Sequence, residues 1–165
     1  MRRGQFLVSL LLLLVLLSAE GLARQPAETQ ATHVLYVTGS TTYFIQCGAT
    51  INYDLLLFVL PWEHWSELRL RVGAGPYYFS SFFLSPGGVG ASGSIALHLL
   101  AGRGPHHLEI SGGGSALVEQ GHESMGFLPL TSVGYRFQDS GAPLVFRVGL
   151  GFPMETVYVS IGTIL

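Results

Sequence analysis

The residues in this chain that are most capable of chemistry are its six histidines. His106 and His107, followed by Glu109, form the closest group, and imidazole nitrogens with a carboxylate are ligands that Zn²⁺ accepts. The three residues lie at a predicted turn, and no second set of ligands follows at the spacing of a zinc motif. The pattern therefore favours a solvated turn over a metal site, and we expect no metal and no cofactor.

A histidine and a serine close together, His122 and Ser124, are the second chemical candidate. A serine beside a histidine base is the pairing that acyl transfer requires, so this pair would suit an enzyme that modifies membrane lipids. No third residue that would orient the histidine can be recognised, and neither Ser92 nor Ser115 occupies the Gly-x-Ser-x-Gly turn of a hydrolase. We expect a protein without catalytic activity and keep the lipid-modifying enzyme as an alternative.

The third feature is a set of charged residues at alternate positions in apolar segments. In ELRLRV, which begins at residue 67, leucines separate the charges, and each strand of the predicted hairpin 126–152 carries one arginine opposite its bulky apolar residues. In a soluble protein these charges would face water. In a membrane barrel they would point into the lumen and be paired, because an unpaired buried charge costs several kcal/mol. The lumen cluster predicted on this second interpretation consists of Glu67, Arg69, Arg71, Glu109, Arg136 and Arg147.

Strands must position these residues, because a period of two runs almost without interruption from His33 onward. The alternation predicts eight strands, at His33–Gly39, Tyr43–Asp54, Trp65–Tyr78, Ile95–Leu100, His107–Glu119, on either side of the Asp139–Ala142 turn within Gly126–Phe152, and at Thr156–Leu165.

The connections between these strands differ in predicted length. Residues 40–42 are expected to form a tight turn, whereas Phe79–Ser94 is expected to be a long loop and 120–125 a second long, polar loop.

Aromatic residues near the strand ends, Tyr158 among them, are expected on the apolar face. Exposed apolar loop residues often mark an interaction surface, and those in the long loop are Phe79, Phe82, Phe83 and Leu84.

The composition favours a membrane environment over water. Only 11% of the residues are charged and the mean hydropathy is +0.45, whereas a soluble domain carries about 25% charged residues. Beyond the first 23 residues the apolar residues are spread through alternating segments, as a transmembrane β-barrel requires. The chain has no lysine and no basic patch, so no nucleic-acid partner is expected. A single cysteine excludes an internal disulfide framework.

The start of the chain has the pattern of a secretory signal peptide. Arg2 and Arg3 precede the apolar run Phe6–Leu17, and Gly21 and Ala23 supply small residues at the −3 and −1 positions of a cleavage site. The run is shorter than the roughly 20 residues of a transmembrane helix. We therefore expect residues 1–23 to be a cleaved signal peptide, 24–32 a short flexible lead-in, and 33–165 a barrel domain.

Together these features predict an all-β protein, a closed antiparallel up-and-down eight-stranded transmembrane β-barrel of the outer membrane. The interior of an eight-stranded barrel is just wide enough for side chains to fill it. The predicted role is therefore structural, or carried by the outer loops, and is not that of a channel. The alternative is a soluble secreted β-barrel that binds a small apolar ligand, in which the apolar phase would line a cavity.

Three segments in the second half of the chain resemble a family of small, uncharacterised bacterial outer-membrane β-barrel proteins. They are AGRGPHHLEISGGG (Ala101–Gly114), LPLTSVGYRFQDSGAPLVFRVGL (Leu128–Leu150) and VYVSIGTIL (Val157–Leu165), and HVLYVTGSTTYFIQCGATINYD is similar more loosely. The resemblance implies an eight-stranded outer-membrane barrel, with outer-membrane lipid and the barrel-assembly machinery as partners, and implies no activity. Such barrels usually end in an aromatic residue, whereas this chain ends in Leu165, so atypical recognition by that machinery is expected.

Overall fold

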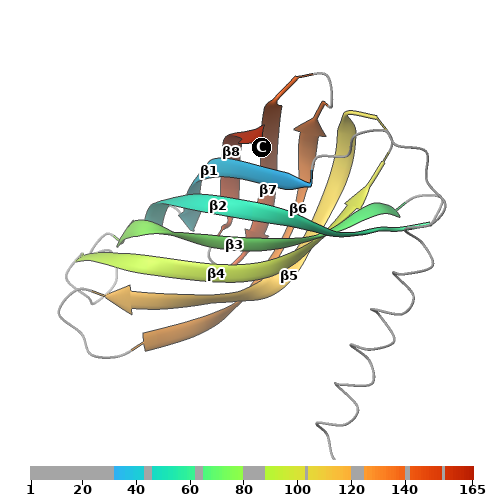
Figure 1. Cartoon of the computed structure of the whole chain (residues 1–165). Helices are drawn as coiled ribbons and strands as arrows, with labels where there is room; N and C mark the ends of the chain where they lie inside the picture. Colours follow the sequence, from blue (N-terminus) through green and yellow to red (C-terminus); the bar gives the residue numbers. More distant parts are fainter. Residues whose placement is uncertain are drawn as a thin grey trace, which may run out of the picture.

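The computed structural model describes residues 32–42, 46–61, 65–79, 88–102, 104–119, 125–139, 142–153 and 155–165. Eight strands form in these ranges: β1 (His33–Thr42), β2 (Gln46–Val59), β3 (Trp65–Phe79), β4 (Gly88–Ala101), β5 (His106–Glu119), β6 (Met125–Gln138), β7 (Leu144–Phe152) and β8 (Val157–Ile164). Each strand pairs antiparallel with the next, and β8 pairs with β1, so the sheet closes on itself (Figure 1). The predicted closed, antiparallel, up-and-down eight-stranded barrel is therefore confirmed.

The alternating sequence explains the strands, because successive side chains of a strand point to opposite faces. In β3, Glu67, Arg69 and Arg71 are buried inside the barrel, and Val72 on the other phase is exposed. The remaining strands place mostly polar residues inside and apolar residues outside, although eight of the buried side chains described are apolar. None of the described residues belongs to a helix that is long and apolar enough to cross a membrane.

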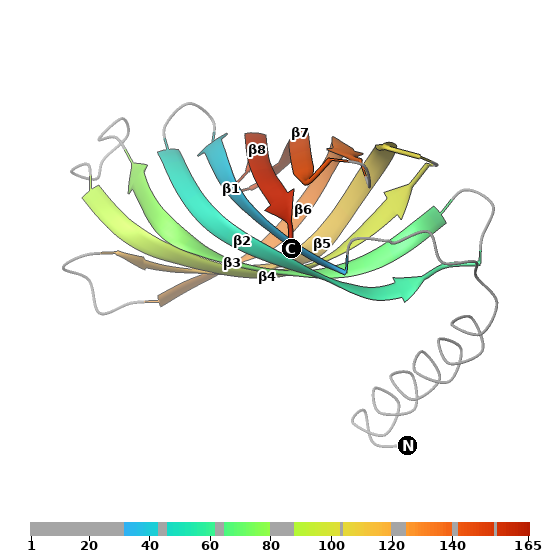
Figure 2. The same ribbon diagram turned by 45° about the horizontal axis from the view of Figure 1, so that its top comes forward.

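The strands are unequal in length, which makes the barrel asymmetric. Strands β2 to β6 contain 14 or 15 residues, whereas β1, β7 and β8 contain 10, 9 and 8. The pairing of β6 with β7 begins only at Thr131, opposite Phe152. Residues 125–130 of β6 therefore extend past the end of β7, and Figure 2 shows the longer strands running along one side of the barrel.

Strand β4 is longer than the sequence predicted. The predicted bounds of the long loop, Phe79–Ser94, are wrong at both ends, because Phe79 is the last residue of β3 and Gly88–Ser94 forms the first half of β4. This glycine- and serine-rich stretch pairs with β3 on one side and with β5 on the other. The two neighbouring strands satisfy its backbone, and that outweighs the low strand preference of glycine. For the same reason residues 40–42 extend β1, opposite β2 and β8, and do not form the expected turn.

The connections confirm the predicted pattern only in part. The stretch between β3 and β4, residues 80–87, is the longest of the seven connections, as expected. The stretch between β5 and β6, residues 120–124, is no longer than residues 60–64 between β2 and β3, so the prediction of a second long loop is wrong.

The position of Tyr158 also differs from the prediction. Its ring lies inside the barrel with 1% of its surface exposed, and not on the apolar face. Two glycines make the room: Gly149 lies opposite Tyr158 in the β7–β8 ladder, and Gly134 lies opposite Gly149 in the β6–β7 ladder. A Cβ atom at Gly149 would lie 2.5 Å from the Tyr158 hydroxyl oxygen, so this inward tyrosine requires glycine on the facing strand.

Candidate functional site

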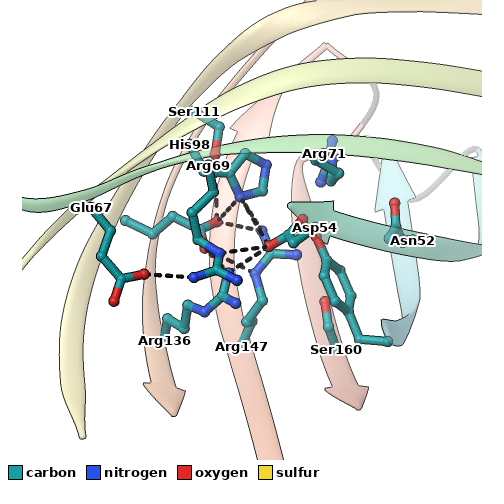
Figure 3. Close-up of polar contacts among 12 residues, drawn as sticks. Asn52, Asp54, Glu67, Arg69, Arg71, His98, Ser111, Arg136, Arg147 and Ser160 are labelled. Carbon is teal, nitrogen blue, oxygen red and sulfur yellow. Dashed lines mark hydrogen bonds and ion pairs between the residues drawn. The ribbon is translucent and has the colours of Figure 1, made fainter. Parts of the chain in front are cut away.

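The lumen is filled by polar side chains from the inward phase of the strands. Among the described residues, 17 buried residues are polar or charged and eight are apolar. The ionisable members are four arginines, four carboxylates and two histidines: Arg69, Arg71, Arg136, Arg147, Asp54, Glu67, Glu109, Glu155, His98 and His107. Seven of them meet in one group, which we call the lumen network (Figure 3): Asp54, Glu67, Arg69, His98, Glu109, Arg136 and Arg147.

Glu109 of β5 and Arg147 of β7 form the tightest contact of the network. Nε of Arg147 donates to Oε2 of Glu109 at 3.0 Å and Nη2 donates to Oε1, so the pair is bidentate. Bidentate, charge-assisted bonds are the strongest that an arginine and a carboxylate can form. The guanidinium carbon also lies 4.5 Å from the ring centre of Tyr36 and 5.3 Å from that of Tyr158. Two aromatic faces therefore take the place of water around this cation.

Asp54 of β2 is the second carboxylate at the centre of the network. It accepts a hydrogen bond from Nη1 of Arg136 at 2.6 Å and one from the Tyr36 hydroxyl at 2.9 Å. The same Nη1 lies 3.5 Å from Oε2 of Glu109, and Nε of Arg136 donates to Gln138 at 2.9 Å. Arg136 thus stands between two carboxylates that would otherwise repel each other.

Arg69 and His98 complete the network. Nη1 of Arg69 donates to Glu67 at 2.6 Å, and its Nε lies 4.0 Å from Oδ2 of Asp54. Nδ1 of His98 lies 3.4 Å from Glu109 and 4.0 Å from Asp54. The network therefore joins side chains from β2, β3, β4, β5, β6 and β7 across the interior.

Arg71 and Glu155 form a separate ion pair towards the other end of the lumen. Nη1 of Arg71 lies 3.3 Å from Oε2 of Glu155, which belongs to the β7–β8 connection. Glu155 borders a cavity of about 40 Å³, which is room for a few water molecules. Six of the eleven residues that line the cavity carry a hydroxyl group: Ser40, Thr50, Tyr77, Ser92, Ser94 and Ser115.

The buried positive and negative charges of the lumen are equal in number, and their side chains fill its cross-section. Four arginines face four carboxylates, so the buried side chains carry no net charge when both histidines are neutral. Burying ion pairs is tolerated only where good geometry and further hydrogen bonds compensate for lost hydration. The network supplies close ion pairs, whereas His98 Nε2, Arg136 Nη2 and Arg147 Nη1 have no hydrogen-bond partner among the described residues. Arg136, Arg147, Asp54 and His98 have no exposed surface, so the described side chains leave no open channel at this level. Within the described ranges, no three His, Cys, Asp or Glu side chains are placed to hold a metal ion.

The six residues predicted for the lumen cluster all point inward, and none exposes more than 4% of its surface. Five of them join the lumen network, whereas Arg71 pairs with Glu155. Alternation alone would have found Asp54, which lies on the polar phase of β2. Among the residues that contact this cluster, the prediction omitted Tyr36, Asp54, His98, Glu155 and Tyr158.

The other chemical candidates are not brought together. His106 and His107 belong to β5 and not to a turn, and they point to opposite faces: His106 is exposed, whereas His107 is 7% exposed and faces the lumen. Adjacent residues of a strand cannot ligate one ion from opposite faces. The remaining predicted residues cannot be placed in the same way. Of the proposed interaction surface, Phe79 is described only in its backbone, and Phe82, Phe83 and Leu84 lie outside the described residues, as do His122 and Ser124.

Fold and site together define an eight-stranded antiparallel barrel with a charged, side-chain-filled lumen. Comparisons of the chain with protein-family models, with curated proteins and with solved structures return no match.

Proposed function

We propose that this protein is an integral outer-membrane β-barrel without catalytic activity, whose lumen is closed by paired charges. The single observation that carries the proposal is the inverted distribution of its residues. In the described part of the chain, 24 large apolar side chains are exposed on the outside, while buried polar residues outnumber buried apolar ones 17 to 8. A soluble domain places its apolar residues inside, so lipid is the environment that fits this surface.

The energetics support lipid as the surrounding solvent. A fully buried Leu, Val, Ile or Phe side chain gains roughly 1.5–3 kcal/mol. Leaving 21 such side chains and three tyrosine rings partly exposed to water would therefore forgo on the order of 20 kcal/mol. Folded proteins are stable by only about 5–15 kcal/mol. A lipid surface removes this cost, because the apolar residues no longer meet water.

Two groups of exposed aromatic residues lie on the outer surface towards the two ends of the barrel. Tyr53, Tyr135 and Phe146 lie towards the end where β1 begins and β8 ends, and the group towards the other end is Tyr78, Phe127 and Phe152. Membrane barrels carry such aromatic girdles at both interfaces. Strands of 8 to 15 residues also bracket the 9–11 residues that a tilted strand needs to cross the hydrocarbon layer.

The signal-peptide pattern of residues 1–23 and the resemblance to small outer-membrane barrels support an outer-membrane location. Outer-membrane lipid and the barrel-assembly machinery are then the expected partners. With the lumen plugged, an interaction role would rest with the outer connections. The apolar residues Phe79, Phe82, Phe83 and Leu84 remain our proposed interaction surface.

The two alternative functions make different demands on the chain. A soluble barrel that binds an apolar ligand needs an apolar interior, whereas the interior formed by the described residues is mainly polar. A lipid-modifying enzyme would depend on His122 and Ser124, and replacing either by alanine would abolish lipid turnover. The proposed barrel predicts no turnover in the parent protein.

Heat-modifiability tests the proposal. Membranes from cells that express the protein are washed with urea, and samples are run on SDS gels with and without boiling. A closed membrane barrel stays in the washed membranes and migrates differently before and after boiling. A protein that appears in the soluble fraction and shows no shift would refute the membrane location.

A further inference from the structure

Two histidine–tyrosine pairs with the same geometry lie on the outer surface of the barrel. The Tyr53 hydroxyl and Nδ1 of His33 are 2.5 Å apart, and their rings stack with centres 5.8 Å apart. The Tyr135 hydroxyl and Nδ1 of His106 are 2.6 Å apart, with ring centres 6.0 Å apart. Two hydrogen-bonded pairs of the same two residue types, from distant parts of the chain, point to a common environment.

The two pairs occupy equivalent places in the barrel. Each histidine is the first residue of its strand, β1 or β5, and each tyrosine lies diagonally across on the next strand, β2 or β6. Two strands lie between the pairs in each direction around the closed sheet, so the pairs lie on opposite walls. Both lie at the end of the barrel where β1 begins and β8 ends, and there Leu165 N donates to His33 O at 3.0 Å.

Both pairs face outward, among apolar neighbours. Tyr53 and Tyr135 are each 39% exposed, and the residues directly opposite them, Leu35 and Leu108, are also exposed. Val34 and His107, which follow the two histidines in sequence, are buried and point into the lumen. Successive residues of a strand point to opposite faces, so the histidines themselves point outward. The pairs therefore face whatever surrounds the barrel.

The bond between histidine and tyrosine leaves each pair with one further hydrogen-bond donor. A neutral imidazole has one N–H and one acceptor nitrogen, and a phenol has one O–H. If tyrosine donates to Nδ1, the N–H remains on Nε2 of the histidine. If Nδ1 donates to the phenol oxygen, the tyrosine O–H remains. In both cases one donor remains in the outward-facing pair, and the side chains of Leu35 and Leu108 opposite the tyrosines offer no acceptor.

On the basis of the proposed membrane location, we propose that the His33–Tyr53 and His106–Tyr135 pairs bind the phosphate groups of phospholipid headgroups. The phosphate oxygens are anionic acceptors, and hydrogen bonds to a charged acceptor are stronger than those between neutral groups. The tyrosine rings lie among apolar residues, as aromatic residues do at a membrane interface. Two such contacts on opposite walls would hold this end of the barrel level with the headgroups.

The test compares two lipids in reconstituted vesicles. The full chain is placed in phosphatidylcholine vesicles and in galactolipid vesicles that have the same acyl chains and no phosphate. The half-life of the heat-modifiable form is then measured at a fixed urea concentration. The double variant His33→Leu/His106→Leu removes the pairs at similar volume, and His33→Gln/His106→Gln keeps a donor at each site as the matched control.

We expect the parent protein to survive at least tenfold longer in the phospholipid than in the galactolipid. The leucine variant should reduce this ratio to below twofold, and the glutamine variant should keep most of it. An unchanged ratio in the leucine variant would overturn the phosphate assignment while leaving the membrane barrel intact. If the parent protein is not heat-modifiable in either lipid, the proposed membrane location fails and this inference fails with it.

Discussion

Removing the carboxylate of Glu109 should destabilise the barrel more than any other single loss of charge in the lumen. Glu109 accepts both bonds of the bidentate Arg147 contact and lies 3.5 Å from Nη1 of Arg136 and 3.4 Å from Nδ1 of His98. The substitution Glu109→Gln keeps the shape and removes the charge. It leaves a guanidinium with no exposed surface and without its bidentate carboxylate.

The expected magnitude follows from the burial of the pair. Removing one partner of a buried ion pair costs about 3–5 kcal/mol, because the other charge stays buried without compensation. With a urea dependence of about 2 kcal/mol per M, this loss lowers the urea midpoint by about 1.5–2.5 M. The two tyrosine rings beside Arg147 lie at 4.5 and 5.3 Å in either case, so they do not offset the missing carboxylate.

The assay is equilibrium unfolding in urea of the protein in lipid vesicles, followed by tryptophan fluorescence and by the heat-modifiable band. Glu119→Gln is the matched control, because Glu119 ends β5 outside the lumen network and is only partly buried. The double variant Glu109→Leu/Arg147→Met removes both charges. It should recover much of the lost stability, since apolar residues can replace a buried ion pair at little cost.

Two results would refute this reasoning. One is a loss of less than about 1 kcal/mol for Glu109→Gln, the size expected of a surface pair. The other is a double variant that is less stable than Glu109→Gln alone, which would mean that the arginine does not suffer from losing its partner.

Three further predictions use the same preparation. Tyr36→Phe removes one hydrogen bond to a buried carboxylate but keeps the ring beside the guanidinium, so it should lower the free energy of unfolding by about 1.5–3 kcal/mol. Tyr36→Leu also removes the ring and should lower it further. If Tyr36→Leu were the more stable variant in urea, the ring contact would not be stabilising. Gly149→Val should abolish the heat-modifiable form. Adding Tyr158→Ala should not restore it, because the Val133 carbonyl oxygen would also lie 2.6 Å from the new Cβ. Full restoration by Tyr158→Ala would show that only the tyrosine requires a glycine at position 149. In planar bilayers the protein should show no steady conductance, because the residues at the centre of the lumen network have no exposed surface; a constant open level would contradict the plug.

The strand phases could be predicted from the sequence wherever polar and apolar residues alternate. In β3 the inward charges are separated by apolar residues, which identifies the lumen face directly. The first half of β4 could not be predicted in this way, because GVGASGS contains few side chains large enough to show a phase. Its strand structure comes from pairing with β3 and β5, which are neighbours in the fold. A local pattern does not report such pairing.

The composition of the lumen network was predictable only in part, for two physical reasons. His98 lies in the run IALHLL, where both phases are apolar, so its inward direction follows only from the exposure of Leu97. Tyr36 and Tyr158 are amphipathic and fit an aromatic girdle or a polar lumen equally well. Their inward position depends on glycines of other strands and on Arg147, which only the closed barrel brings close.

The most direct test of the central claim is whether the outer surface meets lipid at the middle of a strand. Val159 is 48% exposed between the buried Tyr158 and Ser160. A single tryptophan is placed there by Val159→Trp, with Trp62 and Trp65 changed to phenylalanine, and the protein is folded into vesicles. For a surface that meets lipid, we expect strong quenching of its fluorescence by lipids brominated in mid-chain and weak quenching by aqueous iodide. Strong quenching by iodide together with none by brominated lipid would show that this face meets water, and would contradict the membrane barrel.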